Sequence, residues 1–370
     1  MKITGGIVII VIIIIILVFS GQRQQEEGPI KIGVIGPLTG DVSEYGQNVK
    51  NTLNIALEEI NEQGGIREKK LQLIYEDSAC EPAKGVTAIQ KLINIDGVSF
   101  VIDIACSSVV LAEAPIAEDN KVLLMSVTAS NYKIKDAGDY IFRVYPSDAF
   151  QGKELAKLIN SSNHKSVAIV YINNDYGFGL KKVFQEEFKS LGGEIVAVES
   201  HEAGITDFRS LLAKIKTVNP EAIFLAEHPK EGSLLLKQIK ELEIEASIYG
   251  SDAMKDQTVL QGAGSAAENL IMLFSVLPKD TVYEQFNSLY KAKYGKDVES
   301  YAEYGYDALK VLAYVMDKTG LDPTKIKNEL YKIKDFEGIT GLISFDEFGE
   351  RVSVDYETYI VKNGQFMPYE

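Results

Sequence analysis

The sequence predicts an α/β protein with two similar lobes, each built on a parallel sheet that has helices on both faces. From residue 30 onward, short apolar runs alternate with amphipathic stretches, which is typical of parallel strands joined by helices. This alternation occurs in two series of similar length. About 340 residues follow the N-terminal apolar segment, which is more than one hydrophobic core normally serves, so two domains are expected.

The first series begins with an apolar run at residues 30–35, which we interpret as a strand. The next stretch carries apolar residues at helical spacing from Val49 to Ile60 and stops at Gly64 and Gly65. The pattern then repeats in strands at residues 71–75, 98–102 and 122–125 and in helices that start at Pro82 and Ser108.

The second series follows a turn at residues 145–148. Its expected strands are residues 167–171, 194–198, 222–226 and 247–249, and its helices start near Asp148, Tyr176, Thr206 and Lys230. From Pro278 the pattern is helical at residues 283–293, 300–319 and 323–334, and it ends in hairpin-like strands around residues 340–345 and 352–361.

No low-complexity linker separates the two series, so we expect several short crossings between the lobes and a hinge where they cross. The first lobe is assigned residues 29–145 and 278–344. The second lobe is assigned residues 146–277 and 345–370.

The N-terminus carries an apolar run at residues 7–19, preceded by Lys2 and followed by a polar stretch. The run has the length found in export signals and is shorter than the ~20 residues that a membrane-spanning helix needs. We therefore interpret residues 1–28 as a signal peptide, with an uncleaved N-terminal membrane anchor as the alternative. No cysteine follows the run directly, which excludes lipid attachment at a processed cysteine. The protein is expected in the periplasm or at the outer face of the cytoplasmic membrane.

The net charge of −15 limits the partners of this chain. Nucleic acid or an anionic membrane surface would require a basic face, so neither is expected. A small zwitterion, which a few local groups can hold, is compatible with the acidity.

The only two cysteines, Cys80 and Cys106, lie in turns that also carry serine or acidic residues. Two lone cysteines in an exported chain predict one disulfide, and two buried reduced thiols are the alternative. The bond would fix Ser107 and Ser108 at the end of an apolar run, where a hydroxyl and a backbone amide form an anion site.

The sequence lacks the signatures of enzymes. His164, His201 and His228 do not have the spacing of a zinc site, and no G-x-S-x-G motif occurs. The glycine patterns at residues 36–40 and 262–267 lack the P-loop residues or the preceding strand that nucleotide binding requires. We therefore expect no catalytic activity, no cofactor and no metal.

Polar side chains follow the ends of several predicted strands. Ligands of open α/β sheets bind beyond the carboxyl ends of the strands. These ends are rich in hydrogen-bond donors on the first lobe and are acidic and aromatic on the second, which together suit a molecule with both a carboxylate and an ammonium group. Taken alone, each residue is also typical of a surface loop or a helix cap. The residues are Tyr45, Ser107, Ser108 and the turn 126–131 on the first lobe, and Tyr176, Glu227, His228, Ser251 and Asp252 on the second.

These segments together resemble the leucine/isoleucine/valine-binding proteins, which are type I periplasmic solute receptors of ABC importers. The resemblance extends in order from residue 30 to the C-terminus and is carried by residues 32–40, 77–82, 105–108, 142–143, 146–148, 175–179 and 206–208. It implies two Rossmann-like lobes that are joined by a three-stranded hinge and close over an amino acid.

The resemblance also implies roles for individual residues. Ser107 and Ser130 would hold the α-carboxylate of the ligand. The backbone carbonyl of Thr128 and the carboxylate of Asp252 would hold its α-ammonium group. Asp252 stands where the branched-chain binders carry a glutamate, so the charge is kept while the reach is shorter.

The implied ligand pocket has further members. Tyr45 and Tyr176 would form the walls around the ligand's side chain, and Ser108 and Ala129 complete the first-lobe loops of the site. Glu227 and His228 replace a pair of tyrosines, the plainest departure from the family pattern, which leaves the preference for an aliphatic side chain open.

We therefore expect a non-catalytic, monomeric binding protein that captures an amino acid, branched-chain or otherwise apolar, and delivers it to an ABC permease. The alternative is a membrane-anchored sensor ectodomain of the same fold that binds an amide, urea or another small polar ligand.

Overall fold

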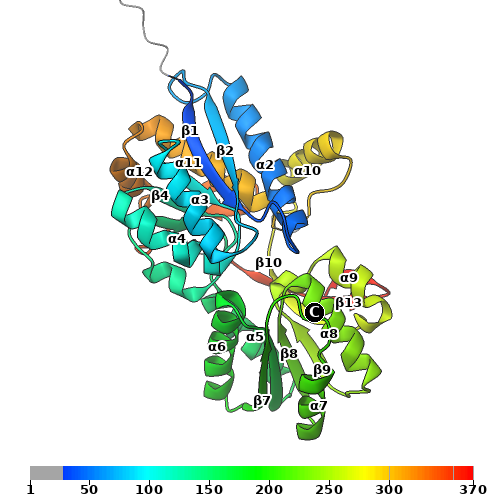
Figure 1. The fold of residues 1–370 in the computed structure, drawn as a ribbon. Helices are drawn as coiled ribbons and strands as arrows, with labels where there is room; N and C mark the ends of the chain where they lie inside the picture. The colour runs from blue at the N-terminus through cyan, green and yellow to red at the C-terminus, as the bar shows by residue number, and fades with distance from the viewer. Residues whose placement is uncertain (1–27, 300, 353, 370) are drawn as a thin grey trace, which may run out of the picture.

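The computed structural model describes residues 28–299, 301–352 and 354–369 (Figure 1). The predicted signal peptide at residues 1–28 lies, apart from Gly28, outside the described residues. Within the described part of the chain, no helix has both the length and the apolar character needed to cross a membrane.

The chain forms two lobes, each with its own sheet and helices (Figure 1). The sheet of the first lobe has five strands in the order β2-β1-β3-β4-β5, and every neighbouring pair is parallel. The strands are β1 (Ile30–Gly36), β2 (Leu71–Asp77), β3 (Phe100–Asp103), β4 (Leu123–Ser126) and β5 (Ile141–Arg143).

Helices cover both faces of this first sheet. Val49 and Leu53 of α2 lie in one apolar cluster with Leu312 of α11, and Ile89 of α3 and Val110 of α4 lie in another on the opposite face. The helices of this lobe are α2 (Ser43–Glu62), α3 (Pro82–Asn94), α4 (Ser107–Asn120), α10 (Thr281–Tyr294), α11 (Glu303–Thr319) and α12 (Pro323–Leu330), with the short η1 (Tyr132–Asp136). The layered α/β arrangement predicted from the sequence is confirmed.

The sheet of the second lobe has seven strands in the order β14-β13-β10-β9-β8-β6-β7. The pairs from β10 to β7 are parallel, whereas β13 and β14 run antiparallel at the opposite edge. The strands are β6 (Ser166–Ile172), β7 (Glu194–His201), β8 (Ala222–Ala226), β9 (Ser247–Gly250), β10 (Ile271–Ser275), β13 (Tyr356–Lys362) and β14 (Gln365–Pro368). The helices are α5 (Asp148–Ser161), α6 (Asp175–Ser190), α7 (Arg209–Val218), α8 (Pro229–Glu241) and α9 (Gln257–Ala263), with the short η2 (Asp252–Met254) and η3 (Gly264–Ala266).

The chain passes between the lobes three times. It leaves the first lobe between β5 and α5, returns between β10 and α10, and leaves again between β12 (Gly341–Ile343) and β13. The first and third crossings lie side by side, because Arg143 forms a β-bridge with Glu350 and the guanidinium of Arg351 donates to the carbonyl oxygen of Val144 at 3.2 Å. The second crossing is joined to the third by the N–H of Val276, which donates to the carbonyl oxygen of Asp355 at 2.9 Å.

The hairpin expected around residues 340–345 and 352–361 is reduced to a single bridge between Phe345 and Arg351. Strand β12 pairs instead with β11 (Phe336–Gly338), and β13 pairs with β10 and β14. The turn from β13 to β14 is made by Asn363 and Gly364, both at positive φ, as a two-residue hairpin turn requires.

Candidate functional site

A cavity of about 240 Å³ lies between the two lobes. It is placed beyond the carboxyl ends of β3 and β4 in the first lobe and of β8 and β9 in the second. The sequence-predicted residues that line it are Tyr45, Ser107, Thr128, Ala129, Ser130, Tyr176, His228 and Asp252.

The first-lobe wall is built around the N-terminus of α4. Ser107 is the first residue of this helix and is 2% exposed. The first N–H groups of a helix have no acceptor within the helix and attract anions. The predicted disulfide between Cys80 and Cys106 is confirmed, with 5.7 Å between the two Cα atoms, and it holds Cys106 at a φ of +76° directly before the helix.

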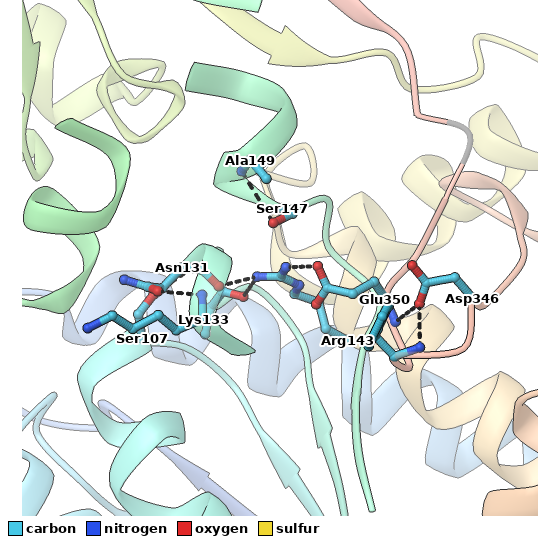
Figure 2. Close-up of polar contacts among 10 residues, drawn as sticks. Ser107, Asn131, Lys133, Arg143, Ser147, Ala149, Asp346 and Glu350 are labelled. Atoms are coloured by element: carbon cyan, nitrogen blue, oxygen red, sulfur yellow. Dashed lines mark hydrogen bonds and ion pairs between the residues drawn. The ribbon is translucent and has the colours of Figure 1, made fainter. Parts of the chain in front are cut away.

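The neighbouring turn after β4 is held by a buried arginine. Arg143 is fully buried, donates to the carbonyl oxygens of Ala129 at 3.2 Å and Asn131 at 3.0 Å, and forms an ion pair with Glu350 (Figure 2). The backbone N–H of Asn131 in turn donates to Oγ of Ser107 at 3.2 Å. This network fixes the turn and the start of α4 relative to each other.

Asn131 also reaches into the second lobe. Its side chain accepts from the N–H of Lys133 at 2.8 Å, which caps η1 (Figure 2). Its Nδ2 donates to the carbonyl oxygen of Asp175. Asp175 is the first residue of α6. The same turn therefore contributes to the cavity wall and to a contact between the lobes.

The second-lobe wall centres on Asp252, which is 3% exposed at the start of η2. The hydroxyl of Tyr145 donates to its Oδ2 at 2.6 Å, and the hydroxyl of Tyr176 donates to its Oδ1 at 3.2 Å. Burial raises the pKa of both tyrosines, and the charge of Asp252 raises it further.

A second buried carboxyl group responds to the charge of Asp252. Asp148 is fully buried, and burial followed by the charge of Asp252 raises its pKa well above the usual value. The raised pKa favours the neutral form of Asp148, which leaves Asp252 as the carboxylate that an ammonium group in the cavity would meet.

Aromatic rings form the remaining walls. Tyr176 stacks on His228 with 5.2 Å between ring centroids and 14° between planes, and Tyr45 meets Tyr301 edge-on at 5.6 Å. The hydroxyl of Tyr45 donates to that of Thr128, so this ring is fixed against the turn after β4.

Ser108, Glu227 and Ser251 were expected at the site and do not line the cavity. Ser251 is fully buried, and its hydroxyl donates to the carbonyl oxygen of Glu227 at 3.0 Å. Ser108 instead accepts from the N–H of Asp175 at 3.1 Å through its Oγ, which joins α4 to α6 of the other lobe. Glu227 is fully buried, and its Oε2 contacts Nε2 of His201 at 2.9 Å. Because Glu227 and His228 are adjacent at the end of β8, they face opposite sides, and only His228 faces the cavity.

Several cavity residues were missed from the sequence. Tyr301 precedes α11 and carries no strand-end signal. Charged residues at the cavity were missed because acidic and basic side chains are frequent everywhere in this chain. They are Asp41, Glu44, Lys230, Glu231, Asp256 and Glu299. Within the described residues, no group of three His, Cys, Asp or Glu side chains is arranged to hold a metal ion.

Comparison with known proteins places the chain in a family. The family model described as periplasmic binding protein matches residues 29–365. The chain is 30% identical over 334 residues to a leucine-, isoleucine-, valine-, threonine- and alanine-binding protein of Pseudomonas aeruginosa, and the match covers 89% of each chain. It is 27% identical over 338 residues to the Leu/Ile/Val-binding protein of Escherichia coli, covering 89% of this chain and 90% of the relative.

Solved structures give the same result. A leucine-binding protein from Thermotoga maritima matches with a TM-score of 0.85 at 30% identity, covering 92% of this chain and 98% of the other. A branched-chain amino acid transporter substrate-binding protein from Streptococcus pneumoniae, solved in complex with isoleucine, matches with a TM-score of 0.81 at 29% identity, covering 91% and 97%. These relatives are described as binding proteins and not as enzymes. The chain belongs to the periplasmic binding protein family.

Proposed function

We propose that this protein binds an amino acid between its lobes and delivers it to an ABC permease. The observation that carries the proposal is the placement of Asp252 across one cavity from Ser107 at the N-terminus of α4. A buried carboxylate and a helix N-terminus on opposite walls provide complementary partners for an ammonium and a carboxylate group.

The α-carboxylate of the ligand would accept from the hydroxyl and backbone amides of Ser107 and Ser130. The α-ammonium group would donate to Asp252 and to the backbone carbonyl of Thr128. Each hydrogen bond to a charged group contributes roughly 1.5 to 3 kcal/mol, so four or five of them suffice for micromolar affinity after the cost of association.

Closure of the lobes follows from the division of these groups. The first lobe is taken as residues 29–145 and 278–344, and the second as residues 146–277 and 345–370. Ser107, Thr128 and Ser130 belong to the first lobe, whereas Asp252 belongs to the second. A ligand that contacts both walls favours the closed arrangement, because only that arrangement completes its contacts. The permease would recognise the closed form.

The relatives support the assignment to transport. The structures that this chain resembles include transporter substrate-binding proteins, one of them with bound isoleucine and one with bound leucine. We propose that the chain is exported by its N-terminal segment, either cleaved or retained as an anchor, and acts as a monomer beside its permease.

Calorimetric titration of the purified protein with leucine, isoleucine, valine and threonine tests this function. We expect micromolar or tighter binding of at least one of them, and a loss of 100-fold or more in Asp252→Asn, because that change removes the charge while keeping the shape. Lys334→Gln, at a residue that does not line the cavity, serves as the control. If wild type binds none of the amino acids but binds an amide or urea, the proposal is wrong.

A further inference from the structure

His228 lines the cavity and has a side-chain nitrogen that none of the groups assigned above uses. Its ring lines the cavity and stacks face to face on Tyr176. Only one of its two ring nitrogens has a hydrogen-bond partner among the described residues, namely Nε2, which lies 3.3 Å from Nδ2 of Asn174.

The protonation of the ring follows from the helix cap beside it. Asn174 caps α6, and its Oδ1 accepts from the N–H of Gly177 at 2.9 Å. That bond fixes the orientation of the amide, so Nδ2 is the atom that faces His228 and must donate. Nε2 of His228 is therefore an acceptor, and in the neutral ring the proton is on Nδ1.

The surroundings keep His228 neutral. Burial lowers the pKa of this ring, although the charges of Glu231 and Asp252 act in the opposite direction. The neutral ring with a protonated Nδ1 is a donor, and a ligand that covers this N–H without accepting from it would displace water and incur a desolvation cost.

We propose that His228 selects an amino acid whose side chain accepts a hydrogen bond, such as a hydroxyl or an amide, over the aliphatic side chain of the same shape. The inference rests on the proposed amino-acid binding function. A polar side chain that accepts from Nδ1 satisfies the donor, whereas a methyl group in the same place leaves it unpaired.

Charged side chains are disfavoured at the same position. Glu231 is 4% exposed on the cavity wall, and together with Asp252 it opposes a ligand with an additional carboxylate. A ligand ammonium group beside His228 would meet an N–H donor instead of an acceptor. The polar and uncharged class therefore fits best.

Pairs of ligands with matching shape test the inference. Threonine and valine differ by a hydroxyl in place of a methyl group, and asparagine and leucine by an amide in place of an isopropyl group. In calorimetric titrations, wild type should bind the polar member of at least one pair about 5-fold or more tightly than the apolar member. His228→Phe, which keeps a ring for stacking, should remove that preference, so that the polar and the apolar member of each pair bind with similar affinity.

His164→Phe is the matched control, because His164 lies against Tyr249 outside the cavity and its replacement should leave every ratio unchanged. Long-range ¹H–¹⁵N correlation spectra provide an independent readout, with a protonated Nδ1 expected for His228. Tighter binding of both apolar members by wild type, or equal ratios in wild type and His228→Phe, overturns the inference and leaves amino-acid binding intact. No binding of any of the four ligands overturns both proposals.

Discussion

Asp41 and Lys230 form an ion pair between the lobes, with 2.8 Å from Oδ1 to Nζ. Asp41 lies in the loop after β1, Lys230 lies in the first turn of α8, and both line the cavity. The two side chains are 58% and 46% exposed, so solvent screens the pair and its contribution is at most about 1 kcal/mol.

Replacing Lys230 should weaken lobe closure slightly. We expect Lys230→Gln to release its amino acid up to about 5-fold faster at low ionic strength, and the difference should disappear in ~1 M salt because salt screens exposed charges. Stopped-flow displacement measures the rate. Lys237→Gln, an exposed change on the same helix, controls for the loss of charge. Equal release rates at low salt would show that the pair has no role in closure.

The pair of Arg143 and Glu350 is buried and should behave differently. Arg143→Met leaves Glu350 buried without its partner and removes the donors to Ala129 and Asn131, so we expect a loss of about 3 to 5 kcal/mol in the free energy of unfolding. Urea denaturation measures it. The double variant Arg143→Met with Glu350→Gln should recover part of this lost stability, because no unpaired carboxylate remains buried. If the double variant is as unstable as the single one, the destabilisation comes only from the lost hydrogen bonds to the carbonyl oxygens of Ala129 and Asn131.

Asp103 and Glu113 make stability depend on pH. Both are fully buried, burial raises the pKa of each, and the charge of Glu113 raises that of Asp103 further. A carboxyl group whose pKa is raised on folding contributes its full stability below its unfolded pKa of about 4 and loses it as the pH rises through the folded value.

Glu113→Gln should therefore stabilise the protein more at pH 8 than at pH 4. The glutamine keeps the shape and donates to the carboxylate of Asp103, which no longer faces a second acid. Thermal unfolding at the two pH values measures the difference. Asp119→Asn, an exposed change on the same helix, should alter the midpoint little at either pH. A gain for Glu113→Gln that is equal at both pH values would contradict the pairing.

The disulfide should support both stability and binding. Cys80 and Cys106 are 26 residues apart, and the double change to serine should cost roughly 3 to 4 kcal/mol on the loop-closure model. Amino-acid affinity should also fall, because Cys106 holds a positive φ directly before Ser107. Urea denaturation and calorimetry measure the two effects. Unchanged affinity in a folded variant would show that the start of α4 is held by the Arg143 network instead.

The sequence predicted the layered fold because its signals are local. The apolar spacing between Val49 and Ile60 identifies a helix, and that segment lies within α2. The Asn363-Gly364 pair is an equally local signal, and it marks the hairpin between β13 and β14. The partner of each C-terminal strand is not local, because β13 pairs with β10, more than eighty residues earlier in the chain.

The site was predictable only where residues follow a strand. Ser107 and Asp252 do so, and the rule for open sheets locates them. Tyr145 and Tyr301 reach the same region from a crossing segment and from a loop before a helix, so their proximity depends on how the lobes meet. Whether Glu227 or His228 faces the cavity depends on the exact residue at which β8 ends, because a shift of one residue would exchange the two sides.

The three connecting segments limit how the protein can move. A single tether would let the halves swivel about many axes, whereas three neighbouring tethers oppose twisting and leave bending as the easy motion. The rims around the cavity should consequently come together in the same alignment on every cycle, so that a membrane partner meets a reproducible surface whenever cargo is enclosed.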